Sequence, residues 1–509
     1  MAKLLLGIDI GTYSSKGVLC RPDGEILAQA RADHDMDIPK PGYAEHDADQ
    51  VWWNDFKAIA NQLSKNVPQG DQIEAVGVSA IGACVLPVDK NGIPLRKGIL
   101  YGVDTRAVDQ INSIEEKYGR QPLVDFGGSR LTTQAIGPKI LWIKQNEPEI
   151  FKKTHKFLTS TSYINFKLTG NYTIDAHTAT EFNPLLDIKS IAWDNRFAGD
   201  ICSLDQLPEI GWSDEIAGTV TRQASADTGI PEGTPVNFGA VDALSEAISV
   251  GVMDIGELMI MYGSTAFFIC LIKHPVSSQE LWLEAGAFQG QYEYSAGLST
   301  SGSATTWFRD QFAQDLLAAQ EKGGANAYAV LADEAATAPV GANGLIMLPY
   351  MSGERTPIFD PKARGVFAGL ALSHTRGDMY RAVLEGTAFA IRMNLEAMRN
   401  SGAEIKHAVA VGGGASNQLW LQMVSDVAGI SQLLPEKTIG ASYGDAYLAG
   451  LMIGAVEMDQ GFENKWVKIS KEIHPNKKNK QTYDQLFPLF KALYHGSKPV
   501  VHALSDLQK

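Results

Sequence analysis

The sequence predicts an α/β protein built from two domains with mixed β-sheets. Short apolar runs typical of strands alternate along the chain with segments of helical periodicity. The chain has 509 residues, which is too many for one hydrophobic core. A hairpin whose turn contains glycine and hydroxyl residues occurs near the start of each half. We therefore expect one domain at residues 1–246 and a second at residues 247–509.

The first half begins with a meander of strands. Residues 3–10 and 15–21 are apolar runs that flank a turn at residues 11–14, and a third strand is expected at residues 25–32. Apolar residues recur at helical spacing over residues 49–63. The other elements expected in this half are a buried strand at residues 73–80 and helices near residues 138–146 and 161–167.

The second half repeats the opening hairpin as a structural motif without repeating its sequence. Strands are expected at residues 257–262 and 266–272, joined by a turn at residues 263–265. The remaining strands are expected at residues 293–298, 344–348 and 407–411, and the helices at residues 305–312, 376–399 and 417–427. The charged residues 471–480 are expected to form an exposed loop.

Composition limits the class of partner. The formal net charge of −14 argues against nucleic acid or an anionic membrane surface. A small anionic ligand is compatible with this charge if backbone N–H groups, a lysine or a metal ion receive it. The four cysteines are scattered in apolar contexts, and no apolar stretch is long enough to span a bilayer. We therefore expect a cytoplasmic protein whose partner is a small molecule, with no membrane contact. A homodimer is the assembly that we consider, and the sequence leaves the oligomeric state open.

The turns of the two hairpins suit phosphate oxygens. Gly11-Thr12 and Gly263-Ser264-Thr265 offer backbone N–H groups and hydroxyls where the chain can be approached closely. Either turn alone is better explained as an ordinary hairpin turn. Two such turns, one in each half, favour a phosphate chain held between two domains. The sequence contains no Walker A pattern, and no Rossmann fingerprint follows a strand with a suitable acid downstream.

Three consecutive glycines separate a buried strand from a helix in the segment VAVGGGASNQLWLQM, residues 409–423. Gly413 and Gly414 would let a flat ring or a phosphate approach the backbone at the helix N-terminus. The alternative is a tight strand-to-helix turn, which seldom needs three glycines. This segment is therefore a moderately specific sign of a ligand.

Two acids stand in unusual places. Asp9 interrupts the first apolar run, and Asp242 ends a glycine-containing apolar run near the expected domain boundary. A carboxylate in a cleft could take the proton of a hydroxyl that attacks a phosphoryl group. Asp242 could equally cap a helix that begins at Ala243, and the residues alone favour this reading modestly. Both interpretations stay open, and they are compatible.

Longer motifs resemble the FGGY family of carbohydrate kinases over nearly the whole chain. GVFAGL at residues 365–370 is followed after seven residues by DMYRAVLE at residues 378–385, which matches the spacing of one family signature. KILWIKQNEPE at residues 139–149 resembles the other signature. LPYMSGERTPIFDPKARGVFAGL, residues 348–370, is similar to the xylulokinase-like members.

The resemblance implies a fold and an activity. Members of this family have two ribonuclease-H-like domains of the actin-like ATPase type, with mixed sheets flanking a deep interdomain cleft. They transfer the γ-phosphoryl group of ATP to a sugar hydroxyl with the help of Mg²⁺. The resemblance therefore implies an ATP-dependent sugar kinase with ATP and Mg²⁺ as cofactors.

The family's functional positions carry over residue by residue. Asp242 matches the catalytic base, and Asp9 together with Asp242 matches the acids on the metal side. The positions that match the ATP site are Gly11, Thr12, Lys16, Gly263, Ser264, Thr265, Gly302, Thr306, Gly413, Gly414 and Asn417. The positions on the sugar side are Ile81, Gly82, Ala83, Asp104, Arg106 and Asp242.

The sugar side departs from the xylulokinase pattern at two places. Residues 81–84 read Ile-Gly-Ala-Cys where xylulokinases carry Gln-Met-His-Gly, and Ala243 follows Asp242 where Asn or Gln is frequent. Each lost hydrogen bond would cost about 1 kcal/mol. D-xylulose is the first substrate we expect, and another pentulose, a polyol or a sugar acid of the ribulose, ribitol or gluconate type is the alternative. A non-catalytic actin-like nucleotide-binding protein is the remote alternative.

Overall fold

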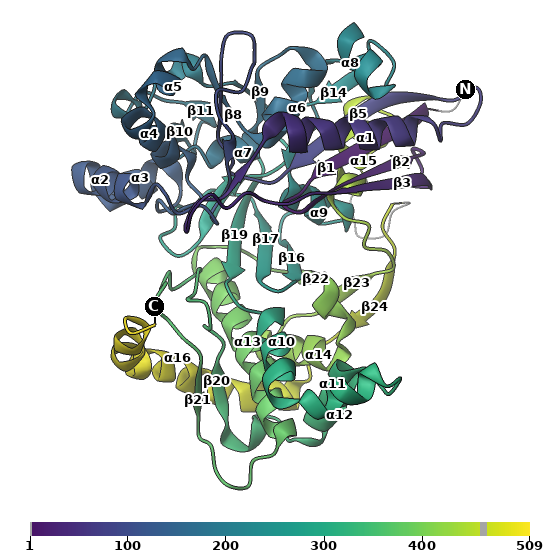
Figure 1. Cartoon of the computed structure of the whole chain (residues 1–509). Coiled ribbons are helices and arrows are strands. Elements are labelled where there is room, and N and C mark those ends of the chain that lie inside the picture. Colours follow the sequence, from purple (N-terminus) through teal and green to yellow (C-terminus); the bar gives the residue numbers. More distant parts are fainter. Residues whose placement is uncertain (1–2, 459–465, 509) are drawn as a thin grey trace. The chain divides into compact units, whose positions relative to one another are not determined.

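The computed structural model describes residues 3–458 and 466–508. The chain forms two compact units, and it contains two large mixed β-sheets (Figure 1). The first unit comprises Met1–Asp254, Leu271–Glu293 and Lys437–Lys468, and the second comprises Ile255–Cys270, Tyr294–Glu436 and Ile469–Lys509. Segments far apart in the sequence are therefore needed to complete each unit.

The sheet of the first unit is mixed, as the sequence predicts. Its strand order is β13-β14-β5-β1-β2-β3, and β15 also pairs with β5. Strand β1 runs parallel to β5 and antiparallel to β2. The strands of this sheet are β1 (Lys3–Ile10), β2 (Ser14–Cys20), β3 (Ile26–Asp33), β5 (Gln72–Ala80), β13 (Ile216–Thr219), β14 (Pro235–Asn237) and β15 (Ala240–Val241).

Helices and four short two-stranded sheets complete the first unit. The helices are α1 (Asn54–Ser64), α2 (Val108–Tyr118), α3 (Arg120–Gly127), α4 (Ile136–Asn146), α5 (Pro148–Lys153), α6 (Ser160–Thr169), α7 (Ala176–Thr180), α8 (Arg222–Thr228), α9 (Asp242–Ser249) and α15 (Ala441–Met452), with shorter turns at Ala48–Trp53, Ala198–Asp200 and Leu204–Gln206. The paired short strands are β4 (Glu45–His46) with β7 (Gly98–Ile99), β6 (Leu86–Val88) with β8 (Lys156–Leu158), β9 (Thr173–Asp175) with β12 (Glu209–Gly211), and β10 (Leu186–Asp187) with β11 (Ala192–Trp193).

The second seven-stranded sheet has the order β18-β19-β17-β16-β22-β23-β24. Strand β16 is antiparallel to β17 and parallel to β22, so this sheet is mixed as well. Its strands are β16 (Glu257–Tyr262), β17 (Ala266–Ile272), β18 (Trp282–Ala285), β19 (Tyr292–Leu298), β22 (His407–Val411), β23 (Gln432–Pro435) and β24 (Ile469–Ile473). Strands β20 (Ile346–Leu348) and β21 (Val366–Ala368) form a separate pair.

The longest helices belong to the second unit. Helix α13 starts with a capping box, in which the Thr375 side chain accepts a hydrogen bond from the Asp378 N–H and the Asp378 carboxylate accepts one from the Thr375 N–H. Among the described residues, no helix is both long and apolar enough to cross a membrane. The helices are α10 (Gly302–Phe312), α11 (Gln314–Glu321), α12 (Ala327–Thr337), α13 (Arg376–Asn400), α14 (Gln418–Ala428) and α16 (Lys477–Ser505), with short turns at Ala342–Gly344 and Gly413–Ser416.

Most expected elements are present with ends shifted by a few residues, but two regions differ. The exposed loop expected at residues 471–480 is wrong, because strand β24 and the start of helix α16 occupy it. Helix α15 was not expected at all. Its first ten residues are all buried, so it lacks the one-sided apolar pattern by which a surface helix is recognised.

Helix α15 rests directly on the backbone of the first sheet. Gly7 and Gly77 face each other across strands β1 and β5. A Cβ atom on Gly7 would lie 1.9 Å from the carbonyl oxygen of Ser442, and one on Gly77 would lie 2.0 Å from that of Asp445. These positions require glycine because the helix backbone fills the space that a side chain would take.

We predict that Gly77→Ala destabilises the first unit. The added methyl group must push helix α15 off strand β5, which would cost about 1–3 kcal/mol and lower the melting temperature measured by circular dichroism. Gly199→Ala is the matched control, because a Cβ atom there meets nothing within 4 Å. Equal melting temperatures for the two variants would contradict the close packing.

Candidate functional site

Three neighbouring strands of the first sheet end side by side. Asp9 of β1 pairs in register with Ser79 of β5, and Ser79 pairs with Ala240 of β15. Both pairings are parallel, so the three residues form one row near the carboxyl ends of the strands. Asp242 follows two residues after Ala240, as the first residue of helix α9. Ligands of α/β sheets bind outside such strand ends, which makes this row the natural place to search for a site.

Asp9 and Asp242 belong to a larger cluster of carboxylates. Ser79 Oγ lies 3.2 Å from Asp9 Oδ1 and 2.8 Å from Asp445 Oδ2, so one hydroxyl links two acids. Ser245 Oγ donates to the other oxygen of Asp445 at 2.7 Å. Asp445 comes from helix α15, and the close packing of that helix on the sheet places it there.

Burial and mutual repulsion raise the pKa values of these acids. Loss of hydration raises the pKa of Asp242 to about 7 and that of Asp445 to about 8. The pKa of Asp9 is raised well above its usual range, first by burial and then by the charges of Asp242 and Asp445. Carboxylates crowded in this way favour a proton or a cation. Their oxygen atoms are the ligands that Mg²⁺ prefers, so the residues present fit this ion.

Asp242 is the half-buried member of the cluster. One of its carboxylate oxygens accepts the backbone N–H of Ala243 at 2.8 Å, and this bond opposes the rise of its pKa. Val241 occupies the N-cap position, so Asp242 is the first residue of helix α9 and not its cap.

The turn at residues 11–14 joins β1 to β2. Gly11 N donates to Ser14 O at 3.1 Å, and Thr12 Oγ1 lies 3.2 Å from the hydroxyl of Tyr101. Lys16 is exposed and pairs in register with Asp9. Burial raises the pKa of Glu246 in helix α9, and the positive charge of Lys16 opposes that rise. Lys16 therefore lies on the same side as the carboxylate cluster.

The sugar-side segment predicted at residues 81–83 follows directly after strand β5. A Cβ atom on Gly82 would lie 2.4 Å from Val241 Cγ2 and 3.4 Å from Glu181 Oε2. This segment is therefore adjacent to the start of helix α9, where Asp242 lies. Ala83 adopts a positive φ of 51°, which is unusual for a residue with a side chain.

Asp104 and Arg106 bond to each other. Two nitrogens of the Arg106 guanidinium contact Asp104, with a shortest distance of 2.6 Å, and a third lies 2.8 Å from Glu45 Oε1. The Arg106 guanidinium also stacks 4.0 Å above the ring of Tyr43. Both charged side chains are buried, with 0% and 1% of their surface exposed. They form a structural pair, and a sugar contact through them stays a prediction.

The second unit contains the other predicted turn, at residues 263–265 between β16 and β17. Ser264 O accepts hydrogen bonds from the N–H of Ser303 at 3.0 Å and from its hydroxyl at 2.8 Å. Gly302 N donates to Gly263 O at 2.9 Å, and a Cβ atom on Gly302 would lie 2.6 Å from that oxygen. Glycine at position 302 thus lets the turn pack against the start of helix α10.

The glycine-rich segment follows the neighbouring strand β22, which is parallel to β16. Gly413 and Gly414 start a short helical turn, and a Cβ atom on Gly413 would meet nothing within 4 Å. Asn417 Oδ1 accepts the N–H of Trp420 at 3.1 Å and so caps helix α14. Thr306 Oγ1 lies 2.8 Å from the hydroxyl of Tyr328. In the second unit, two glycine-containing segments therefore follow the carboxyl ends of the parallel strands β16 and β22.

The sequence interpretation missed Asp445, Ser79 and Glu181. Asp445 is a lone acid in the apolar segment ASYGDAYLAG, which is the same signal that singled out Asp9. Ser79 and Glu181 have no such local signal. Among the described residues, Glu181 Oε2 is buried without a hydrogen-bond partner, and burial raises the pKa of this carboxyl well above its usual range.

Comparison with known proteins assigns the chain to a family. Residues 4–249 match the model of the N-terminal domain of the FGGY family of carbohydrate kinases. Residues 258–453 match the model of the C-terminal domain of the same family. Together the two matches cover most of the chain.

Individual relatives agree with this assignment over their full length. The chain is 29% identical to a protein named xylulose kinase from Bacillus subtilis (strain 168), with both chains covered completely. It is 26% identical to a gluconokinase from Bacillus licheniformis, covering 96% of this chain and 95% of the relative. The crystal structure of xylulose kinase from Rhodospirillum rubrum superposes with a TM-score of 0.90 at 29% identity, covering 98% of this chain and 100% of that one. The chain belongs to the FGGY family of carbohydrate kinases and is an ATP-dependent sugar kinase.

Proposed function

We propose that this enzyme transfers the γ-phosphoryl group of ATP to a hydroxyl of a ketose, with D-xylulose as the first candidate and Asp242 as the catalytic base. The observation that carries the proposal is the placement of half-buried Asp242 beside Asp9, next to the carboxyl ends of β1, β5 and β15. A metal-binding acid and a base in one place are what phosphoryl transfer to an alcohol requires.

Asp242 has the properties of a general base. Its carboxylate would accept the proton of the sugar hydroxyl while the hydroxyl oxygen attacks the γ-phosphorus. A base works best when its pKa lies near the working pH, and burial raises the pKa of Asp242 to about 7. The neighbouring segment at residues 81–83 would hold the sugar against this carboxylate.

Asp9 and Asp242 would hold Mg²⁺, directly or through water. When bound, the ion would neutralise negative charge on the phosphates of ATP. The buried carboxylates support this assignment, because each has a raised pKa and lies close to at least one other acid. Asp445 would remain behind them as a support held by two serine hydroxyls.

We propose that the two hairpin turns receive the phosphate chain of ATP. Gly11 and Thr12 would supply backbone N–H and hydroxyl donors, and Lys16 a positive charge. In the second unit the turn at residues 263–265 would act in the same way, with Gly302 and Thr306 beside it. Gly413, Gly414 and Asn417 would receive the adenine side. The domain division at residues 1–246 and 247–509 is part of this proposal.

The substrate class rests on the relatives and on the sugar-side residues. Relatives named xylulose kinase match the whole chain, which supports a pentulose. A relative named gluconokinase supports a sugar acid as the second candidate. A small cavity is lined by residues that include Thr180 and Glu284. Arg130 and Gln134 line this cavity together with Glu181, and a guanidinium is a suitable partner for a sugar carboxylate.

A cytoplasmic location also belongs to this proposal. ATP is plentiful in that compartment, and Cys20, Cys84 and Cys202 are buried and form no disulfide. Free buried thiols are typical of a reducing environment.

We predict that Asp242→Asn lowers the turnover of D-xylulose by a factor of about 10²–10⁴ while ATP still binds, because an amide cannot accept the proton. A coupled assay of ADP release measures the turnover. Asp227→Asn, in helix α8, is the control and should keep full activity. Turnover near the unsubstituted level in Asp242→Asn would remove Asp242 from the role of base.

We predict that Lys16→Met raises the KM for ATP roughly tenfold with a smaller effect on the KM for sugar, because one charge-assisted contact to phosphate is lost. Lys57→Met, in helix α1, serves as the control for loss of a lysine elsewhere in the first unit. An unchanged KM for ATP in Lys16→Met would show that Lys16 does not contact the nucleotide.

The substrate prediction is tested by a panel of D-xylulose, L-ribulose, ribitol and D-gluconate, with ATP alone as the blank. We expect D-xylulose to give the highest kcat/KM. A higher value with D-gluconate would shift the assignment to a sugar acid. Failure of every compound to raise ADP release above the blank would contradict a kinase for these sugars.

A further inference from the structure

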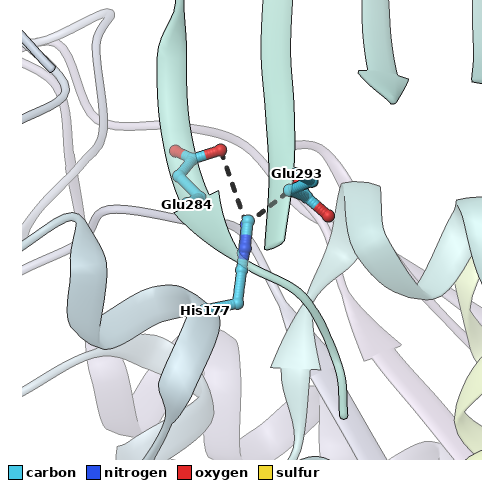
Figure 2. A group of neighbouring side chains, drawn as sticks. All are labelled: His177, Glu284 and Glu293. Carbon is cyan, nitrogen blue, oxygen red and sulfur yellow. Dashed lines mark ion pairs between the residues drawn. The ribbon is translucent and has the colours of Figure 1, made fainter. Parts of the chain in front are cut away.

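Three side chains that bind metal ions elsewhere in proteins meet outside the cluster around Asp242. His177 of helix α7, Glu284 of strand β18 and Glu293 of strand β19 point toward one another (Figure 2). His177 Nε2 lies 3.8 Å from Glu284 Oε2 and 3.8 Å from Glu293 Oε1. The three ligand atoms all lie within 4.8 Å of one another. All three residues belong to the first unit.

The contact between the imidazole and the carboxylates is not an ordinary ion pair. The side chains of His177 and Glu293 are almost fully buried, with 3% and 0% of their surface exposed. Burial lowers the pKa of His177 to about 3. At 3.8 Å the nitrogen and the oxygens are also too far apart for a hydrogen bond.

The separations suit ligands of one cation. Zinc lies about 2.0–2.2 Å from nitrogen and oxygen ligands, so two ligands of a tetrahedral ion are about 3.4 Å apart. The two observed distances of 3.8 Å exceed this value by a few tenths of an ångström. Small rotations of the two glutamate side chains would close the difference. A neutral imidazole is also the form in which histidine binds a metal ion.

A fourth carboxyl group interacts electrostatically with one of the three side chains. Glu181 follows helix α7, and its pKa is raised first by burial and next by the charge of Glu284. Lys139 opposes this rise, but burial lowers the pKa of Lys139 itself to about 8. A divalent cation between the glutamates would offset the repulsion that these acids exert on one another.

The position of His177 is prepared by its own helix. Asp175 caps α7, with one carboxylate oxygen accepting the N–H of Thr178 at 2.8 Å and the other accepting its hydroxyl at 2.7 Å. Asp175 has 0% of its surface exposed. The helix turn that carries the imidazole is therefore fixed before any ion binds, which lowers the entropic cost of binding.

We propose that His177, Glu284 and Glu293 bind one divalent first-row transition cation of the Zn²⁺ type. An imidazole with two carboxylates suits such a cation, whereas Mg²⁺ prefers oxygen ligands alone. Three protein ligands leave one coordination position for water, and Glu284 also lines a small cavity together with Thr180 and Glu181. The ion would tie helix α7 to β18 and β19. The proposal does not depend on the identity of the sugar or on the role of Asp242.

Crystals of the unsubstituted protein soaked in Zn²⁺ test the site directly. We expect an anomalous difference peak, measured at the zinc edge, within about 2.3 Å of His177 Nε2 and of one oxygen from each glutamate. A map with no peak between these three side chains would overturn the proposal, even if zinc bound elsewhere. This measurement needs no variant and so does not depend on how substitutions affect folding.

Solution measurements give a second, independent readout. Protein stripped of metal should take up one equivalent of Zn²⁺ in a chelator competition, and this site should be weakened about tenfold or more in His177→Ala and in Glu284→Gln. His407→Ala is the matched control, because His407 faces one glutamate, Glu257, at 3.9 Å. Asp242→Asn is a second control, which tests whether the zinc binds at the carboxylate cluster instead. Both control variants should still take up one equivalent of Zn²⁺ with unchanged affinity. Unchanged affinity in folded Glu284→Gln would overturn the proposal.

Zinc should also raise the melting temperature of the unsubstituted protein, because the ion would bind only the folded form. The same addition should leave the melting temperature of Glu284→Gln unchanged. An equal rise in both proteins would place the stabilising ion elsewhere and contradict the site.

Discussion

The close approach of helix α15 to strands β1 and β5 is the constraint on which the first unit depends. The helix backbone occupies the space above Gly7 and Gly77, and no residue with a side chain could replace either glycine without moving it. This contact joins a segment near residue 445 to strands from the start of the chain. It also delivers Asp445 to Ser79, which in turn contacts Asp9. The packing of helix α15 on the sheet therefore also determines which carboxylates lie together at the strand ends.

Burying several carboxylates near one another costs stability, and the raised pKa values of Asp9, Asp242 and Asp445 express that cost. Such crowding is typical of functional sites, where a proton or a cation is meant to bind. The roles proposed for Asp9 and Asp242 would account for this crowding, since phosphoryl transfer to an alcohol uses a metal ion and a base. His177, Glu284 and Glu293 form a second group of buried ionisable side chains, in another part of the first unit.

The candidate ligand-binding segments of the second unit are glycine-containing turns, whereas the candidate site of the first unit is a cluster of carboxylates. The turn at residues 263–265 accepts hydrogen bonds from Gly302 and Ser303 at the start of helix α10. This turn follows strand β16, and the glycine-rich segment follows the parallel strand β22. Open N–H groups at such turns can receive phosphate oxygens without a nearby cation. The two family models match separate parts of the chain, residues 4–249 and residues 258–453.

Much of the fold could be predicted because its signals are local. The hairpin of β1 and β2 follows from two apolar runs around a turn, and α13 follows from its periodicity. Helix α15 could not be recognised, because a helix buried on all sides carries no one-sided pattern. The charged residues of strand β24 and of the start of α16 resemble a solvated segment, so the sequence predicts a loop there.

By itself, the sequence determined the mixed α/β class, most of the elements, the family, and Asp9 as an acid out of place. Only the tertiary structure decided which acids share one environment. Asp445 joins Asp9 across more than four hundred residues, and Glu293 meets His177 from a different sheet strand. The physical reason is that electrostatic and coordination energies depend on separation in space. Spacing along the chain records that separation only within a helix, a strand or a turn.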